Sequence, residues 1–269
     1  MQSKDRLTIT LNKNLLLRLD SIIDGNKIRN RSHAIEYVIG KYLGAGITKA
    51  VILAGGDKKQ CASSVLRIHN RPVIAYQIEQ LKEANIRDLV IVINKKYPYI
   101  KEYLGTGKQW NLNITYIEDK KNTGTAQALL LAKQYIKSTF LMLYCDLLVD
   151  IDLLDFINFH QALPNKFITL SVAPSMHPHY FGVCITKGNL IAEYQEKPKP
   201  SRFFHLASTG IAVMEPSIFP LIKNNRSLGH DIFPGLAQNS QLFNYASSSN
   251  WYNVSYPDEL ESAEKYWKK

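Results

Sequence analysis

Residues 50–56 read AVILAGG, which is five apolar residues followed by two glycines. A run that is apolar throughout predicts a strand buried on both faces, as in a parallel sheet covered by helices. Two further runs of this kind, at residues 88–93 and 139–144, follow with amphipathic stretches between them. This alternation predicts an α/β, doubly wound domain with a mostly parallel sheet, whose ligands bind beyond the carboxyl ends of the strands.

The composition of the 269-residue chain is that of a globular protein, with 45% apolar and 21% charged residues. These values exclude a disordered or fibrous protein. The sequence has no apolar run long enough to span a membrane and no secretory signal at its N-terminus, so we expect a cytoplasmic protein without a membrane partner. Three widely spaced cysteines, Cys61, Cys145 and Cys184, fit a reducing compartment better than a disulfide framework or a zinc site.

The first forty-odd residues have a different pattern. Polar and apolar residues alternate over residues 6–11, which predicts a short, half-buried strand. Two amphipathic helices are predicted next, one ending at Gly25 and one beginning after the N-cap residue Asn30. Glycines then indicate a linker, so we divide the chain into domains at residues 1–45 and 46–269.

This short N-terminal segment is both apolar and basic. A strand and two helices of this size cannot bury their apolar faces alone, which favours pairing with a second copy of the chain. Residues 1–46 hold 8 basic and 4 acidic residues, a charge of +4 out of +10 for the whole chain. The excess favours a polyanion as partner, although a lysine-rich proteome explains it equally well.

The stretches RLTITL, LLLRLDSIIDG and NRSHAIEYVIGKYL resemble the ribbon-helix-helix DNA-binding family over residues 4–43. The resemblance implies a homodimer, or a higher even oligomer, whose paired strands enter the major groove of double-stranded DNA. The implied base-reading side chains are Arg6, Thr8 and Thr10, and the implied phosphate contacts are Asn30, Arg31 and Ser32. The alternative is that this segment only dimerises the chain.

The large domain resembles the sugar-1-phosphate nucleotidyltransferases over residues 48–268, through segments such as VILAGG, RPVIAYQIEQLKEANI, YCDLLVDID and WYNVSYPDELESAE. That family joins a nucleoside triphosphate to a sugar phosphate and releases pyrophosphate. The resemblance implies that a nucleotide or sugar nucleotide is bound by Leu53, Ala54, Gly55, Gly56, Gly124 and Thr125. It further implies that the sugar phosphate is held by Glu196, Lys197 and Gly210, and that the cofactor Mg²⁺ is held by Asp146 and Asn253. Asp146 and Lys197 would also serve catalysis.

The first loop departs from the pattern of this family, which normally runs GGxGTRL. Here residues 55–60 read GGDKKQ, so the family's Arg is absent, and its later Lys falls on Ser63. Lys58 is the candidate catalytic cation that replaces them, with Lys59 and Arg67 as alternatives. Loss of one preorganised charge slows turnover by about 10²–10³, which favours nucleotide binding over turnover.

Together these observations favour a dimeric, nucleoid-associated transcriptional regulator whose large domain binds a nucleotide or sugar nucleotide. The alternative is a working Mg²⁺-dependent sugar-1-phosphate nucleotidyltransferase that uses the N-terminal segment for dimerisation or autoregulation. A scaffold without either activity is the third option. The sequence leaves open whether the chain is an enzyme, and which base, sugar and operator it would bind.

Overall fold

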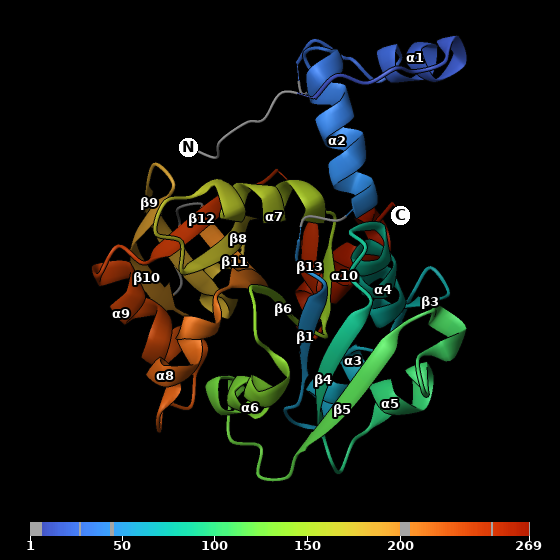
Figure 1. Ribbon diagram of the computed structural model, residues 1–269. Coiled ribbons are helices and arrows are strands. Elements are labelled where there is room, and N and C mark those ends of the chain that lie inside the picture. Colours follow the sequence, from blue (N-terminus) through green and yellow to red (C-terminus); the bar gives the residue numbers. More distant parts are fainter. Residues whose placement is uncertain (1–6, 27, 44–45, 200–204, 249, 269) are drawn as a thin grey trace.

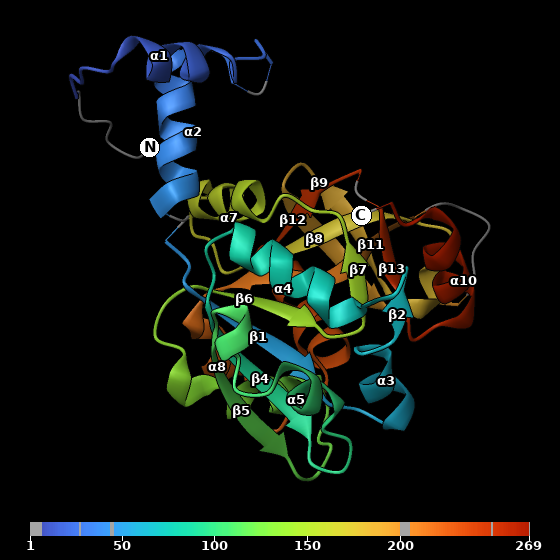
Figure 2. The same ribbon diagram turned by 90° about the vertical axis from the view of Figure 1, so that its right-hand side faces the viewer.

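The computed structural model describes residues 7–26, 28–43, 46–199, 205–248 and 250–268. Over these residues the main body is a nine-stranded sheet with helices on both faces, while two N-terminal helices stand away from it (Figures 1 and 2). None of the helices in the described part of the chain combines the length and apolar character needed to cross a membrane.

The elements follow the predicted alternation of strands and helices. The α-helices are α1 (Lys13–Asp20), α2 (Arg31–Leu43), α3 (Lys58–Ser63), α4 (Val73–Glu83), α5 (Tyr99–Leu104), α6 (Thr125–Leu131), α7 (Leu153–Ala162), α8 (Phe219–Ile222), α9 (Phe233–Gln238) and α10 (Pro257–Tyr266). The strands are β1 (Lys49–Ala54), β2 (Arg67–Ile68), β3 (Arg71–Pro72), β4 (Asp88–Asn94), β5 (Asn113–Asp119), β6 (Phe140–Tyr144), β7 (Leu147–Val149), β8 (Ile168–Ser175), β9 (Gly182–Lys187), β10 (Leu190–Glu196), β11 (His205–Met214), β12 (Leu242–Ala246) and β13 (Trp251–Asn253).

The large sheet is mixed. Its strands lie in the order β5-β4-β1-β6-β11-β8-β12-β10-β9. The first four are parallel, and three of them, β4, β1 and β6, are the apolar runs that predicted a parallel sheet. In the other half, β11 is antiparallel to β6 and β8, and β10 is antiparallel to β12 and β9. The prediction of a mostly parallel sheet therefore holds for one half only. The antiparallel strands β9 and β10 expose several residues, which antiparallel strands tolerate and buried parallel strands do not.

Successive side chains of β1 enter two separate cores. Ala50, Ile52 and Ala54 pack with residues of α4, α5 and α7, whereas Val51 and Leu53 pack with residues of α6, α8 and α9. Side chains of a strand alternate between its faces, so a strand between two apolar layers must be apolar at every position. This is the physical reason for the continuous run AVILA.

The N-terminal arm, residues 7–43, differs from the predicted ribbon-helix-helix module. Residues 7–11 are extended but form no strand within the described chain, and Arg6 lies outside the described residues. A ribbon needs a second strand to supply hydrogen bonds, and nothing in the described part of this one chain pairs with the segment. All five side chains of residues 7–11 are exposed: Thr8, Thr10, Leu7 (76% of its surface), Ile9 (43%) and Leu11 (37%).

The start of α2 is held by contacts within the arm. The Asn30 side chain accepts a hydrogen bond from the His33 backbone amide at 2.9 Å, and Ser32 is exposed. The Arg31 guanidinium donates to both carboxylate oxygens of Asp20, at 2.7 and 2.8 Å. Arg31 therefore links α1 to α2, which is a structural reason for its presence other than a phosphate contact.

Candidate functional site

The carboxyl ends of β1 and β6 meet at one edge of the sheet. The two strands are parallel neighbours, with Leu53 opposite Tyr144. Beyond them, the Cys145 backbone amide donates to the Leu53 carbonyl oxygen at 3.2 Å. This pairing places the loop at residues 55–56 beside Asp146, where ligands of such sheets bind.

A pocket of about 620 Å³ opens at this edge. Its volume is in the usual range for small-molecule sites. Ten of the residues assigned from the sequence line it together: Leu53, Gly55, Gly56, Gly124, Thr125, Asp146, Glu196, Lys197, Gly210 and Asn253. Two others do not, since Ala54 is buried in the core and Lys58 is exposed on α3 outside the lining.

The start of α6 forms one wall of the pocket together with the segment at residues 226–230. Gly124 has a φ of +97°, and a Cβ atom at this position would lie 2.4 Å from the Arg226 carbonyl oxygen. That oxygen instead accepts from the Ala126 amide at 3.0 Å, and the Leu228 amide donates to Thr125 Oγ1 at 3.0 Å. Only glycine permits this close approach.

Asp146 is the buried acid of the pocket, with 9% of its surface exposed. Burial raises the pKa of its carboxyl, because desolvation disfavours the charged form. Hydrogen bonds from the side chains of Ser255 and Asn253, and the nearby charge of Lys197, partly oppose this increase in the pKa. The Ser255 hydroxyl donates to Asp146 Oδ2 at 2.6 Å.

The donor set at Asp146 and Asn253 fits a hard divalent cation. Both side chains carry oxygen, and both line the pocket. Asn253 Oδ1 accepts from the Ser255 amide at 2.9 Å, and an amide oxygen has a second lone pair available. Mg²⁺ usually takes one or two protein ligands and completes its shell with waters and substrate phosphates.

Glu196, at the end of β10, is fixed in the lining of the pocket. The Tyr194 hydroxyl donates to Glu196 Oε2 at 2.7 Å. The same oxygen lies so close to Gly229 that a Cβ atom there would be 2.1 Å away. The carboxylate is thus held between a phenol and a glycine at the lining of the pocket.

Lys197 has a backbone conformation that is uncommon for a residue with a side chain, with φ +47°. Its amide donates to the Phe181 carbonyl oxygen at 2.9 Å, and its ammonium lies 5.9 Å from the centre of the Tyr256 ring. Conformations of this kind persist where the surroundings enforce them, and they are enriched at functional sites.

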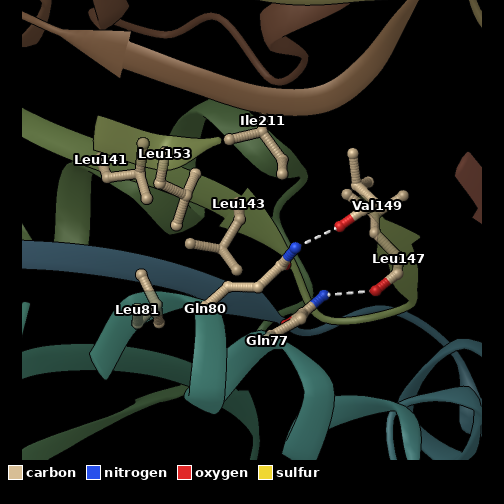
Figure 3. A pocket seen from close by; sticks show the side chains of 9 residues that line it. All are labelled: Gln77, Gln80, Leu81, Leu141, Leu143, Leu147, Val149, Leu153 and Ile211. Carbon is tan, nitrogen blue, oxygen red and sulfur yellow. Dashed lines mark hydrogen bonds between the residues drawn. The ribbon is translucent and has the colours of Figure 1, made fainter. Parts of the chain in front are cut away.

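Two glutamines of α4 hold the turn that carries Asp146. Gln77 Nε2 donates to the carbonyl oxygens of Tyr144 and Leu147, both at 2.9 Å. Gln80 makes a further hydrogen bond to a carbonyl oxygen of β7, so that both glutamines reach this strand across a cavity of about 10 Å³ (Figure 3). The backbone on either side of Asp146 is therefore tied to α4.

The altered first loop contains a helix start. Asp57 accepts from the Gln60 amide at 2.9 Å, and the Gln60 side chain accepts from the Asp57 amide at 3.0 Å, which is a capping box. Asp57, the acidic residue of this loop, thus serves as the N-cap of α3. Of the three replacement cations considered, Lys59 lines the pocket, whereas Lys58 and Arg67 do not.

Several pocket residues were not found from the sequence. They are Arg226, His230, Ser255, Tyr180 and Tyr256. Ser255 lies two residues after Asn253, so its proximity was a usable signal. The others come from connecting segments whose course depends on the tertiary structure, and no spacing rule places them here.

The whole of the large domain matches one family. The model for the family described as nucleotidyl transferase matches residues 49–269. The chain is 28% identical over 229 residues to a mannose-1-phosphate guanyltransferase of Saccharomyces cerevisiae, a match that covers 80% of this chain and 63% of that protein. It is 26% identical over 209 residues to a probable mannose-1-phosphate guanylyltransferase 3 of Arabidopsis thaliana, covering 74% and 62%. The matches thus span less than two thirds of these relatives.

A solved structure supports the fold. The crystal structure of a putative glucose-1-phosphate thymidylyltransferase from Bacillus anthracis, in complex with a sucrose, superposes with a TM-score of 0.71 at 22% identity. The match covers 81% of this chain and 94% of that one. The mixed α/β arrangement of the large domain is therefore that of a nucleotidyltransferase.

These findings overturn the prediction of a DNA-binding regulator. The relatives carry the names of transferases, and the family match occupies the domain to which binding of a nucleotide or sugar nucleotide was assigned. Neither the DNA partner nor the nucleoid location has support, and the ribbon on which both depended is not formed within the described residues. The enzyme alternative is the better supported of the two, and the chain belongs to the nucleotidyl transferase family.

Proposed function

We propose that the chain is an active, Mg²⁺-dependent sugar-1-phosphate nucleotidyltransferase. The observation that carries this proposal is the pocket of about 620 Å³, in which the residues assigned from the sequence come from six separate segments. They are the first loop with the end of β1, the start of α6, the Asp146 turn, the end of β10, β11 and the end of β13. The names of the relatives make GTP and mannose 1-phosphate the first substrates to test.

The nucleotide would bind along the first loop and the start of α6. Gly55 and Gly56 have no side chains, so backbone amides at the end of β1 are open to a phosphate or ribose. Gly124 and Thr125 would line the base. Lys59 would supply positive charge to this part of the site, since it lines the pocket and the adjacent Lys58 does not.

The sugar phosphate would bind at the end of β10. Glu196, held by Tyr194, is an acceptor for sugar hydroxyl groups. Lys197 and Gly210 line the same pocket, and the Lys197 ammonium is a partner for the phosphate of the sugar. Residues that hold both substrates in one orientation reduce the entropic barrier to their reaction.

In the transfer, an oxygen of the sugar phosphate attacks the α-phosphorus of the nucleotide. A phosphorus–oxygen bond forms there while the bond from the α-phosphorus to the bridging oxygen breaks, and pyrophosphate leaves with the electron pair. Mg²⁺, when bound at Asp146 and Asn253, would neutralise part of the negative charge of the reacting phosphates. A phosphate monoester is already an anion at neutral pH, since its second pKa is about 6, so no side chain has to remove a proton from it.

The N-terminal arm is proposed as a separate domain, residues 1–45, whose role is dimerisation. Its described part exposes eight large apolar side chains: Leu7, Ile9, Leu11, Leu15, Leu17, Tyr37, Val38 and Ile39. No residue of α1 is buried. Sedimentation should show a dimer that becomes a monomer when Leu7, Ile9 and Leu11 are changed to Ser; a native chain that stays monomeric contradicts this role.

Transferase activity is tested by mixing the purified chain with Mg²⁺, each of the four nucleoside triphosphates and a panel of sugar 1-phosphates. We expect pyrophosphate release and formation of a sugar nucleotide with at least one pair of substrates. The matched variant Asp146→Asn keeps the shape of the side chain and removes its charge, and it should lower the rate by at least about 10². A folded wild-type chain that forms no sugar nucleotide with any pair contradicts the proposal.

A further inference from the structure

Ser255 contacts both of the side chains assigned to the metal. Its hydroxyl donates to Asp146 Oδ2 at 2.6 Å, and its backbone amide donates to Asn253 Oδ1 at 2.9 Å. The three residues line the same pocket. One residue thus bonds to an oxygen of each candidate ligand, although the two ligands are more than a hundred positions apart in the sequence.

The backbone around Ser255 is held in register with the Asp146 turn. Strands β13 and β7 pair antiparallel, with Asn253 opposite Leu147. The Val254 amide then donates to the Asp146 carbonyl oxygen at 3.0 Å. Ser255 follows this last bond, just before α10 begins at Pro257. Its position relative to Asp146 is therefore set by two strands and by the start of a helix.

The hydroxyl of Ser63 lies beside that of Ser255, but the Ser255 hydroxyl donates its proton to Asp146. Ser63 Oγ lies 3.2 Å from Ser255 Oγ, and it donates to the Lys59 carbonyl oxygen at 2.9 Å. Each hydroxyl has one proton. The Ser255 hydroxyl therefore donates its proton to Asp146 Oδ2, its nearer partner at 2.6 Å.

Ser63 also occupies the position at which a lysine is expected from the resemblance to the family. The side chain beside Ser255 is thus a neutral hydroxyl, buried to 3% exposure, rather than an ammonium. No cation lies at this position to orient the Asp146 carboxylate. A hydrogen bond to an ionised carboxylate is short and strong, so the Ser255 hydroxyl is sufficient to fix its orientation.

We propose that Ser255 is the positioning residue of the metal site: its hydroxyl orients the Asp146 carboxylate, and its amide orients the Asn253 side chain. The proposal rests on the function proposed above, because it takes these two side chains as the ligands of Mg²⁺. Residues that orient metal ligands without touching the metal typically contribute about 10-fold to 100-fold to metal affinity.

The test measures binding of Mn²⁺ alone by electron paramagnetic resonance, in which the signal of free Mn²⁺ falls as the ion binds. The full chain is compared with Ser255→Ala, with the conservative variant Ser255→Thr, and with the control Ser262→Ala. Ser262 lies outside the pocket, where its hydroxyl bonds to the Asp258 carbonyl oxygen. We expect Ser255→Ala to weaken binding by about 10-fold to 100-fold, whereas Ser255→Thr and Ser262→Ala bind like the native chain.

Native affinity for Mn²⁺ in a folded Ser255→Ala variant overturns the proposal. So does a native chain that binds no Mn²⁺, or one whose binding is unchanged by Asp146→Asn. If Ser255→Ala does not fold, Ser255→Cys keeps a side chain of similar size with a poor donor, and the same loss is expected. A chain whose Mn²⁺ affinity is lowered by Asp146→Asn and by Ser255→Ala, but which forms no sugar nucleotide, contradicts the transferase proposal and supports the positioning role.

Discussion

Gln77 of α4 and Leu147 of β7 are joined by a hydrogen bond of 2.9 Å from the Gln77 side chain to the Leu147 carbonyl oxygen (Figure 3). The same nitrogen donates to the Tyr144 carbonyl oxygen on the other side of Asp146. A helix on one face of the sheet thereby fixes the turn that carries the buried acid of the pocket.

The Gln77→Met variant should destabilise the fold and disturb the Asp146 turn. It retains the length of the side chain and removes both donors, which leaves buried carbonyl oxygens without this partner. Such a loss typically costs about 1–3 kcal/mol, measurable as a lower urea midpoint. Gln134→Met, at an exposed position, is the control and should unfold like the native chain. Equal midpoints for the two variants contradict this role of Gln77.

The adjacent residues Lys58 and Lys59 distinguish the sequence-based assignment from the structural one. Lys59 lines the pocket and Lys58 does not. We expect Lys59→Met to lower the rate of pyrophosphate release by about 10²–10³, the usual effect of losing one preorganised charge. The comparison is with Lys58→Met under the same conditions. If Lys58→Met lowers the rate of pyrophosphate release more than Lys59→Met does, the sequence-based assignment of Lys58 as the catalytic cation is supported instead.

The Gly229→Ala variant should displace the Glu196 carboxylate, because the new Cβ would lie 2.1 Å from its Oε2 atom. We expect a higher KM for the sugar phosphate and a loss of up to about 10² in kcat/KM, as when a contact group moves by about 1 Å. Gly235→Ala is the matched control, since its Cβ would meet nothing within 4 Å. An unchanged KM in Gly229→Ala shows that Glu196 does not contact the sugar.

Cys61 should react slowly with thiol reagents. Burial, together with the nearby charges of Asp57 and Asp146, raises the pKa of its thiol to about 11. With that pKa, about 0.1% of the thiol is ionised at pH 8, and only the thiolate reacts. Burial also raises the pKa values of Cys145 and Cys184. Ellman's reagent should therefore label the native chain far more slowly than the chain in urea, and rapid labelling of a folded thiol contradicts the buried environment.

His160 should make the fold less stable in mild acid. It is fully buried between Thr169 and Glu215, and burial lowers the pKa of its ring despite the Glu215 carboxylate. In the unfolded chain His160 takes up a proton near pH 6.5, whereas in the folded chain its pKa is lower. The unfolded chain therefore binds more protons as pH drops from 7 towards 5, and the free energy of unfolding falls. His160→Gln removes this proton, and its stability should change less over that range. An equal slope in both chains contradicts the prediction.

The sequence predicted well where a residue's environment follows from its own neighbours in the chain. The run AVILA must be buried on both faces, and the positions after such strands must lie at one edge of the sheet. Ten of the assigned positions accordingly line one pocket. The sequence was less informative for β9, β10 and β12, whose short or half-exposed strands leave no continuous apolar run.

The sequence by itself determined that the large domain is an α/β sheet with polar residues and glycines at its strand ends, because burial dictates residue type locally. Only the tertiary structure decided that Lys59 rather than Lys58 lines the pocket, and that Ser255 and Ser63 surround Asp146. These relations depend on the pairing of β13 with β7 and on the contact between Ser63 of α3 and Ser255, which join segments far apart in the chain. Hydrogen bonds across such distances are set by packing, and no local periodicity encodes them.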